Sequence, residues 1–533
     1  MKPQGAAPGL PLSYFIIFLT GAATLALELL SSRVLTPYFG VSLYIWSSIL
    51  SITLTFLAIG YYGGGRLARR NDGAQRHFAF FAAPAISALA IVAACLIYPW
   101  LFPWLAGIDL VFGSVIAATV LLAVPLVVLS AMNPLLIAIR PEAAGDAGAG
   151  RVFFVSTIGS VAGVVATAFL LIPNVTNFRG LLLLAIILAA LPAFGAISAG
   201  APRQRRSLVA AAAIGLALAG GLFAWAPTYL GKSKDLFAGD YRFRLRAEYS
   251  SVFGDLKVVE FADRNDPSRY LILFLTDGLV QNRLLPDRRS YSEYTYMLEA
   301  LGAAYAPDAQ RVLVLGLGAG AVPRALAERG FTVDAVEINP DMLTAVQEHV
   351  APESGWTAHI GDARTYVRDC RQRYDLAVID LFHGDGTPDY LLSADFFRDL
   401  RQCLTPDGIA VMNAFALDRE ALNYRSLIAT VGSAFPDIVA FRPPTSPDGP
   451  NLNNYLVAMP SPRASKSFRI TDVPPDLQES LAATLRSRTV VADIDPSLVV
   501  TDEHNVFSIL NADDQMTFRR LLVQQLPPQL LVN

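Results

Sequence analysis

The sequence predicts a multi-span α-helical membrane domain, followed by an α/β Rossmann-like domain that begins with a small β-rich lead-in piece. Charged residues make up only 16% of the 533 residues, against roughly 25% in an average soluble protein. They are also unevenly spread, because residues 1–230 hold only 17 of the 87. The second half contains a glycine-rich turn between two strand-like runs, which is typical of nucleotide-binding α/β units. A single soluble globule and a protein made only of membrane helices are therefore both excluded.

The first 230 residues read as a membrane domain. A bilayer span needs about 20 mostly apolar residues. Seven such runs lie near residues 13–34, 42–65, 78–102, 111–138, 152–172, 180–200 and 208–227. We therefore expect about seven transmembrane helices in residues 1–230, a multi-pass location in the cell (inner) membrane, and the lipid bilayer as a partner.

The loops between these runs differ in charge. The arginine-rich loops contain Arg66, Arg69, Arg70, Arg76, Arg140, Arg151, Arg203, Arg205 and Arg206. The opposite loops hold only Arg33 and Arg179. Since cytoplasmic loops carry the excess of Lys and Arg, the amino terminus is expected inside. Seven spans then leave the carboxy-terminal domain outside.

Charge and cysteine content limit what the second half can do. Residues 231–533 carry 30 basic and 40 acidic groups, which argues against a nucleic-acid partner, since that would call for a basic patch. The three cysteines, Cys95, Cys370 and Cys403, suggest no disulfide framework and no metal spacing. The histidines also lack ligand spacing, so we expect no metal.

A linker and a β-rich region cover residues 231–300, with strand-like runs at 256–260 and 270–275. The Rossmann-like domain is then expected over residues 301–533. It opens with a buried-type strand at 311–315, the turn Gly316-Leu317-Gly318-Ala319-Gly320, a helix at 321–329 and a second strand that ends in Glu337. Gly316, Gly318 and Gly320 allow the backbone to turn tightly and approach a ligand. Glu337 could accept hydrogen bonds from two ribose hydroxyls, so the pattern predicts a nucleoside site.

Two later strands also lead into acidic residues. The run at 358–360 precedes Gly361-Asp362-Ala363, where Asp362 could contact an adenine amino group. The run at 376–379 leads directly to Asp380. An acid at the carboxyl end of a parallel strand points into the ligand crevice, so Asp380 is the candidate general base. In the tail, 499–502 is a candidate last strand.

These residues resemble the spermidine synthase family, or polyamine aminopropyltransferases, over roughly residues 245–460. The resemblance is carried by Leu275 to Gln281, Asp287 to Glu293, Val336 to Asn339, Gly361 to Ala363 and Tyr374 to Asp380. It implies a class I methyltransferase-type fold, with Asp380 and Tyr291 as catalytic residues. It also implies that Gln281, the turn glycines, Glu337, Asp362 and Ala363 bind the donor. Segments of residues 27–67 resemble the bacterial branch in which such a domain follows membrane spans.

The sequence departs from that family where a cationic amine would bind. The family has an Asp at the position of Ala319 and another at the position of His383. The family's Pro-Thr-Tyr-Pro segment reads Pro-Thr-Ser-Pro here, with Ser446 in place of the tyrosine. Asp385 or Asp389 could substitute for a missing carboxylate. The predicted acceptor pocket therefore contains His383, Asp385 and Ser446, with fewer charges to anchor a polyamine.

Three functions are compatible with these features. The first is transfer of an aminopropyl group from decarboxylated S-adenosylmethionine to a small amine, a step of polyamine biosynthesis. The second is methyl transfer from S-adenosylmethionine to an amphipathic acceptor. The third is ligand sensing or transport without catalysis. A homo-oligomer is compatible with each, and an adenosyl donor is expected in the cytoplasm, in conflict with the loop charges.

Overall fold

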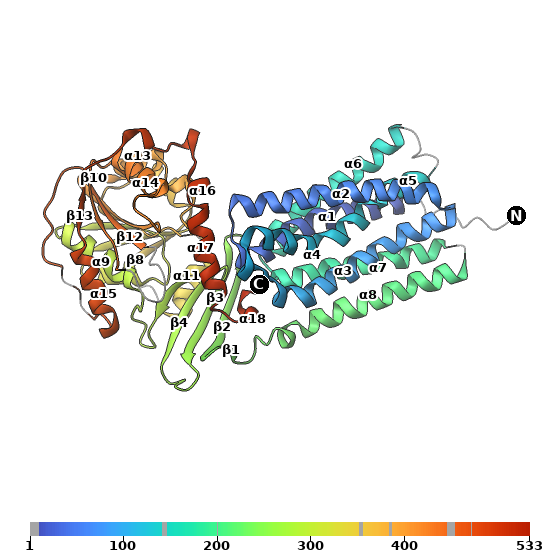
Figure 1. Cartoon of the computed structure of the whole chain (residues 1–533), viewed down its shortest axis with the longest axis horizontal. Helices are drawn as coiled ribbons and strands as arrows, with labels where there is room; N and C mark the ends of the chain where they lie inside the picture. The colour runs from blue at the N-terminus through green and yellow to red at the C-terminus, as the bar shows by residue number, and fades with distance from the viewer. Residues whose placement is uncertain are drawn as a thin grey trace. The chain divides into compact units, whose positions relative to one another are not determined.

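The computed structural model describes residues 10–140, 146–199, 201–350, 355–382, 386–444, 453–468, 470 and 472–533. The chain divides into two compact units (Figure 1). The first contains residues 1–236, 250–252 and 520–533. The second contains residues 237–249 and 253–519.

The first unit is built from long helices. They are α1 (Leu10–Phe39), α2 (Leu43–Arg70), α3 (Gly73–Ile108), α4 (Leu110–Ser130), α5 (Met132–Ile139), α6 (Asp146–Ala166), the π-helical turn η2 (Thr167–Leu171), α7 (Asn177–Ser198) and α8 (Pro202–Tyr229). Helices α4 and α5 continue each other and together form one candidate span. Among the described residues, seven helical segments are long and apolar enough to cross a membrane. This agrees with the seven runs expected from the sequence.

Small residues let some of these helices touch backbone to backbone. A Cβ atom added to Gly159 of α6 would lie 2.1 Å from the carbonyl oxygen of Phe18 in α1. One added to Gly163 would lie 2.2 Å from the carbonyl oxygen of Ala22. On the other side of the unit, Gly60 of α2 approaches the carbonyl of Val127 in the same way. Glycines four residues apart are a common device for close helix packing in membranes.

The second unit opens with an antiparallel sheet of five strands in the order β1-β2-β3-β4-β5. They are β1 (Leu236–Ala238), β2 (Tyr241–Ser251), β3 (Gly254–Asp263), β4 (Tyr270–Thr276) and β5 (Leu279–Leu284). Val258 pairs with Phe274, and both are fully buried. The β-rich piece expected from the runs at 256–260 and 270–275 is thus present, and it leads into α9 (Glu293–Tyr305).

A mixed sheet of eight strands forms the centre of this unit, in the order β13-β11-β12-β10-β9-β6-β7-β8. Its strands are β6 (Arg311–Leu315), β7 (Thr332–Glu337), β8 (Trp356–Ile360), β9 (Tyr374–Ile379), β10 (Leu404–Phe415), β11 (Asp437–Phe441), β12 (Asn453–Met459) and β13 (Thr489–Val491). Strands β10, β9, β6, β7 and β8 run parallel. The antiparallel β12 follows β10 in the sheet. The α/β architecture expected from the sequence is therefore present.

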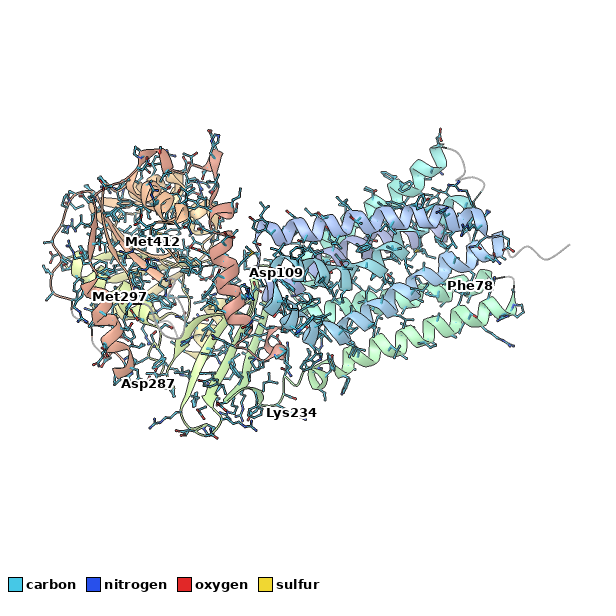
Figure 2. All side chains as sticks on the ribbon, in the orientation of Figure 1. Phe78, Asp109, Lys234, Asp287, Met297 and Met412 are labelled. Atoms are coloured by element: carbon cyan, nitrogen blue, oxygen red, sulfur yellow. A yellow bond between two sulfur atoms is a disulfide. The ribbon has the colours of Figure 1, made fainter. Side chains whose placement is uncertain are left out.

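Helices cover both faces of this sheet, because side chains along each strand alternate between two cores. The helices are α10 (Ala321–Glu328), α11 (Pro340–His349), α12 (Ala363–Arg368), α13 (Ala394–Cys403), α14 (Leu422–Gly432), α15 (Pro475–Arg486) and α16 (Phe507–Leu510). Helices α17 (Ala512–Val523) and α18 (Pro528–Leu531) follow, and α18 packs against α3 within the first unit. Val314 and Met297 belong to the core beneath α9 and α10. Leu315 and Met412 belong to the core beneath α13 and α14. Figure 2 labels both methionines.

Two details differ from the sequence-based expectations. Residues 499–502 do not form a strand, since residues 499–501 lie between 3₁₀ turns at Pro496–Leu498 and Asp502–His504, and Asp502 begins the second turn. The amide of Val500 bonds the hydroxyl of Thr430 instead of a neighbouring strand. The expectation of no disulfide was also wrong, because Cys370 and Cys403 are bonded with their Cα atoms 5.6 Å apart. Thirty-three residues separate them in sequence, and only the packing of α12 and α13 brings them together.

The contact between α1 and α6 leads to a first prediction. Gly163→Leu should force the two helices apart, because the new side chain has no space beside Ala22. Overpacking of this kind costs roughly 1–3 kcal/mol, so thermal unfolding in detergent should begin at a lower temperature. Gly150→Leu is the matched control, since nothing lies within 4 Å of a Cβ at that position of α6. Equal melting temperatures for the two variants would contradict the packing described.

Candidate active site

The glycine turn and Asp380 meet at the carboxyl edge of the parallel strands. Leu315 and Ile379 are register partners on β6 and β9, so the residues that follow them lie side by side. The amide of Asp380 donates to the carbonyl of Leu315 over 2.9 Å. A Cβ atom on Gly316 would sit only 2.1 Å from the carbonyl oxygen of Asp380, and Gly316 also has a φ of +94°. Glycine is therefore required at this position on two grounds.

The other two predicted glycines continue the turn. Gly318 and Gly320 both have positive φ, at +52° and +72°. Gly320 directly precedes α10. The glycine turn therefore leads from a strand to the amino end of a helix, as it does in nucleotide-binding units.

Glu337 lies across the turn, at the end of β7. One carboxylate oxygen accepts from the amide of Leu317 over 3.1 Å, and the other accepts from the amide of Asn339 over 2.8 Å. Burial raises the pKa of Glu337, while these amides work in the opposite direction. Each carboxylate oxygen has a second lone pair. Glu337 can therefore still accept a hydroxyl group, and its role toward a ribose stays a prediction.

Asp362 and Ala363 lie after β8, on the same edge of the sheet. Asp362 caps α12, since its carboxylate accepts from the amide of Thr365 over 2.8 Å. Its other oxygen accepts from the hydroxyl of Tyr390 over 2.9 Å. Ala363 is buried as the first residue of α12. The proposed adenine contact is not tested by these bonds, and Tyr390 is a partner that the sequence did not indicate.

Asp380 is a partly buried carboxyl group, and the described residues give it one side-chain partner. The amide group of Asn413, on the neighbouring strand β10, donates to it over 3.0 Å. Burial raises the pKa of Asp380 to about 6, and the bond from Asn413 counteracts part of that rise. Such an acid changes its protonation state close to neutral pH, which suits a general base.

Asn413 has unused hydrogen-bonding capacity beside this acid. Its side chain is 2% exposed. Its amide oxygen is buried and has no hydrogen-bond partner within the described ranges. A buried acceptor without a partner is costly. Asn413 therefore has an unused hydrogen-bond acceptor next to Asp380.

Tyrosines line the same side of the sheet. Tyr294 is partly buried, and desolvation together with the charge of Asp380 raises its pKa well above the usual value. Its hydroxyl donates to the carbonyl of Gln281 over 3.2 Å. Tyr455, the register partner of Asn413 on β12, also has its pKa raised by burial, with a contribution from Asp380. Asp380 therefore lies among neutral phenols and an amide.

Asn282 connects the five-stranded sheet to the glycine turn. Its side-chain oxygen accepts from the amide of Ala319 over 2.6 Å. Its side-chain nitrogen donates to the hydroxyl of Tyr294. Ala319 itself is fully buried. One side chain on β5 thus fixes both the turn and the tyrosine beside Asp380.

The predicted residues are only partly brought together. Gly316, Gly318, Gly320, Glu337 and Asp380 share one edge of the sheet. Gln281 contributes its carbonyl to Tyr294. The hydroxyl of Tyr291 instead bonds Asp476 of α15 over 3.0 Å, and Tyr294 is the tyrosine beside Asp380. His383, Asp385 and Ser446 lie outside the described residues.

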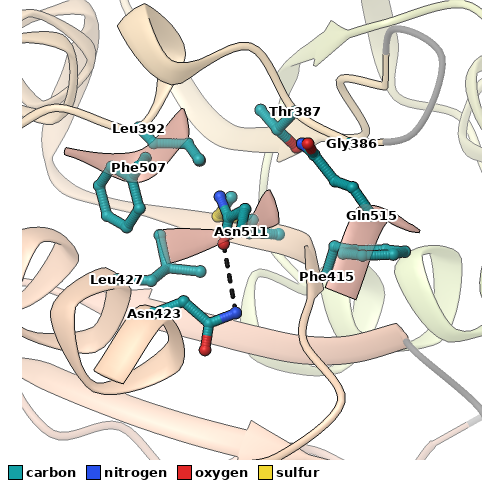
Figure 3. A pocket seen from close by; sticks show the side chains of 10 residues that line it. Gly386, Thr387, Leu392, Phe415, Asn423, Leu427, Phe507, Asn511 and Gln515 are labelled. Carbon is teal, nitrogen blue, oxygen red and sulfur yellow. Dashed lines mark hydrogen bonds between the residues drawn. The ribbon is translucent and has the colours of Figure 1, made fainter. Parts of the chain in front are cut away.

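A small cavity lies elsewhere in this unit (Figure 3). It is lined by apolar side chains such as Met412 and by the amides of Asn423, Asn511 and Gln515. Asn423 donates to Asn511 over 3.2 Å across it. Met412 points to the core beneath α13 and α14, whereas its neighbour Asn413 points to Asp380 on the other face. Neither Asp380 nor Asn413 is among the residues that line the cavity, although Phe415, two residues after Asn413, is.

Metal ligands are not grouped in the part of the chain that the structure describes. No set of three or more His, Cys, Asp or Glu side chains there could hold a metal ion. The chemistry available at this edge of the sheet is that of a buried carboxyl, phenols, amides and exposed backbone.

The second unit is similar in sequence to known transferases. A family described as "Spermine/spermidine synthase domain" matches residues 291–448. A polyamine aminopropyltransferase of Vibrio vulnificus is 29% identical over 227 residues, which is 40% of this chain and 70% of that protein. An N-terminal histidine N-methyltransferase of Emericella nidulans is 30% identical over 214 residues, which is 38% of this chain and 38% of that protein.

A solved structure is also similar. The crystal structure of a probable spermidine synthase from Corynebacterium glutamicum has 18% sequence identity and a TM-score of 0.37, and the match covers 47% of this chain and 91% of that chain.

The burial of Asp380 leads to a second prediction, which needs no substrate. In the folded protein its carboxyl stays protonated up to about pH 6, whereas in an unfolded chain it ionises near pH ~4. Stability should therefore fall between about pH 4 and 6 and stay lower above that. Asp380→Asn cannot ionise, so at pH 7.5 it should raise the free energy of unfolding by roughly 1–3 kcal/mol, and by much less at pH 4.

Chemical denaturation at the two pH values measures this difference. Asp308→Asn is the control, since that side chain is 91% exposed and its replacement should have little effect at either pH. A destabilising effect of Asp380→Asn at pH 7.5 would contradict the raised pKa of Asp380.

Proposed function

We propose that the C-terminal part of this chain, in which residues 291–448 match the spermine/spermidine synthase domain family, is a transferase of that kind, and that it moves an aminopropyl group from decarboxylated S-adenosylmethionine to a small amine. The observation that carries the proposal is the position of Asp380, a buried acid placed against the glycine turn of a nucleoside-type site.

The residues of the site suit this chemistry. The acceptor nitrogen forms a bond to the propyl carbon, the carbon–sulfur bond breaks, and the sulfonium leaves as a neutral thioether. The nitrogen must first lose a proton, which Asp380 can take. The unpartnered amide oxygen of Asn413 can accept a second N–H of the amine and hold it in place. Because the donor is already activated, positioning and one base can suffice.

The donor would lie along the glycine turn. Its ribose hydroxyls would bind Glu337, and its adenine would approach Asp362 and Ala363. Asn282 supports the donor-binding part of the site indirectly, because it fixes the glycine turn through the amide of Ala319.

Methyl transfer from S-adenosylmethionine is a second candidate, and Ala319 favours it. The side chain of Ala319 is fully buried in the core, so the turn offers no carboxylate to the ammonium group of an aminopropyl donor. One of the similar proteins is an N-terminal histidine N-methyltransferase. The same base and the same nucleoside site would serve either reaction.

We also propose that the first unit spans the cell membrane. Large apolar side chains on its helices face outward, as with Ile197 at 80%, Phe112 at 74% and Phe169 at 71% exposure. Such surfaces are unfavourable in water and favourable in lipid. The span formed by α6 and η2, Asp146–Leu171, is the most exposed of the seven, since only 17% of its most apolar stretch of 18 residues is buried within the unit.

The product identifies the reaction. Purified full-length protein, incubated with each adenosyl donor and a panel of small diamines, should yield an amine heavier by one aminopropyl group, detected by mass spectrometry. Asp380→Asn should lower turnover by about 10²–10⁴-fold and still bind the thioether nucleoside, while Asp308→Asn should match the wild type. A methylated product would replace the first candidate by the second, and full turnover in Asp380→Asn would remove that residue from the mechanism.

Extraction of membranes tests the location. Alkaline carbonate should leave the full-length chain in the membrane pellet and release peripheral proteins. A variant chain that begins at residue 237 should lose this behaviour. Release of the full-length chain into the supernatant would contradict membrane insertion.

A further inference from the structure

The two ends of the helical unit differ in charge. At one end lie the turn between α2 and α3, the end of α5, and the beginnings of α6 and α8, which carry Arg66, Arg69, Arg70, Arg76, Arg140, Arg151, Arg203, Arg205 and Arg206. The other end has fewer basic residues, namely Arg33 near the end of α1, Arg179 near the start of α7, and Lys232 and Lys234 just after α8. Figure 2 labels Phe78 near the arginine-rich end of α3 and Asp109 just past its other end. If the unit spans a membrane, the arginine-rich end is cytoplasmic.

The carboxy-terminal segment of the first unit, residues 520–533, contacts helices at the arginine-poor end. The side chain of Arg520 donates to the carbonyl of Gly107, near the end of α3, over 3.1 Å. The carbonyl of Asn533 accepts from the amide of Phe178, near the start of α7, over 2.7 Å.

Two further contacts lie at that same end. Helix α8 ends there as well, because the hydroxyl of Tyr229 donates to the carbonyl of Leu96 over 2.7 Å. Arg33 bonds the carbonyl of Val252. These contacts within the first unit fix an odd number of crossings before residue 230, without relying on a count of apolar runs.

A disulfide gives an independent observation from the second unit. Cys370 follows α12 and Cys403 ends α13. Their Cα separation of 5.6 Å lies in the range usual for disulfides. Cys403 is almost fully buried. Disulfides of this structural kind persist in oxidising compartments and are rare in the cytosol.

We infer that the transferase unit works on the non-cytoplasmic side of the membrane, in an oxidising compartment, with Cys370–Cys403 as a structural crosslink. The inference rests on the proposed membrane insertion, and it does not depend on which group is transferred. The thiols of Cys370 and Cys403 lose two electrons and two protons to a disulfide of another protein in that compartment, which is reduced to two thiols by thiol–disulfide exchange. The distribution of loop charges and the expected cytoplasmic location of an adenosyl donor imply opposite sides of the membrane for this unit. The inference follows the loop charges, and it requires that the cationic donor is carried across the membrane.

Thiol counting tests the crosslink in living cells that make the full-length chain. Cells are quenched in acid to stop exchange, and the denatured protein is treated with a maleimide–polyethylene glycol that adds mass at each free thiol. The expected result is one adduct, at Cys95, and three adducts after prior reduction. The double variant Cys370→Ser/Cys403→Ser should give one adduct with or without reductant. Three adducts without reductant would overturn the inference.

Labelling of new cysteines tests the side of the membrane. Arg269→Cys lies in the second unit, where the native side chain is 90% exposed, and Gln75→Cys lies exposed at the arginine-rich end. A membrane-impermeant maleimide added to cells with a permeable outer envelope should label the first in intact cells, and the second only after lysis. The reverse pattern would overturn the inference. Carbonate extraction of the same cells separates that outcome from a failure of membrane insertion.

Discussion

The parallel register of three strands is the constraint on which the candidate site depends. Pairing of β6 with β7 and with β9 places Gly316, Glu337 and Asp380 at one edge of the sheet. Their side chains and backbone can meet only because Gly316 has no Cβ, since any other residue would strike the carbonyl of Asp380. A slip of one residue in β9 would turn the carboxylate to the opposite face of the sheet. The chemistry proposed for Asp380 is thus a consequence of strand pairing.

The surroundings of Asp380 explain why this acid is suited to proton transfer. It has no cationic partner among the described residues, and burial is the main cause of its raised pKa. Asn413 and the nearby tyrosines are neutral and polar, so they can orient a substrate without fixing the acid in its charged form. Asn282 adds rigidity, because it holds both the turn and Tyr294. An arrangement of this kind stores unfavourable energy at the site, which the well-packed cores on both faces of the sheet offset.

Much of this could be read from the sequence. The apolar runs predicted the helices, and the pattern of strand, glycine turn, helix, strand and acid predicted the first half of the site, because those signals are local. Tyr294 and Asn413 could not be identified in the same way. Which of several tyrosines faces Asp380 depends on how α9 packs on the sheet, and Asn413 reaches Asp380 only through the pairing of β10 with β9. The Cys370–Cys403 bond has the same origin, since two residues 33 apart are brought together only by tertiary packing.

The central claim is that a nucleoside donor lies on the glycine turn with its reactive carbon facing Asp380. A structure of the full-length protein with the thioether nucleoside product bound tests it most directly. We expect the ribose hydroxyls within hydrogen-bonding distance of Glu337, and the sulfur on the side of the turn that faces Asp380 and Tyr294. A nucleoside bound elsewhere, for instance in the cavity beside Asn423, would contradict the account.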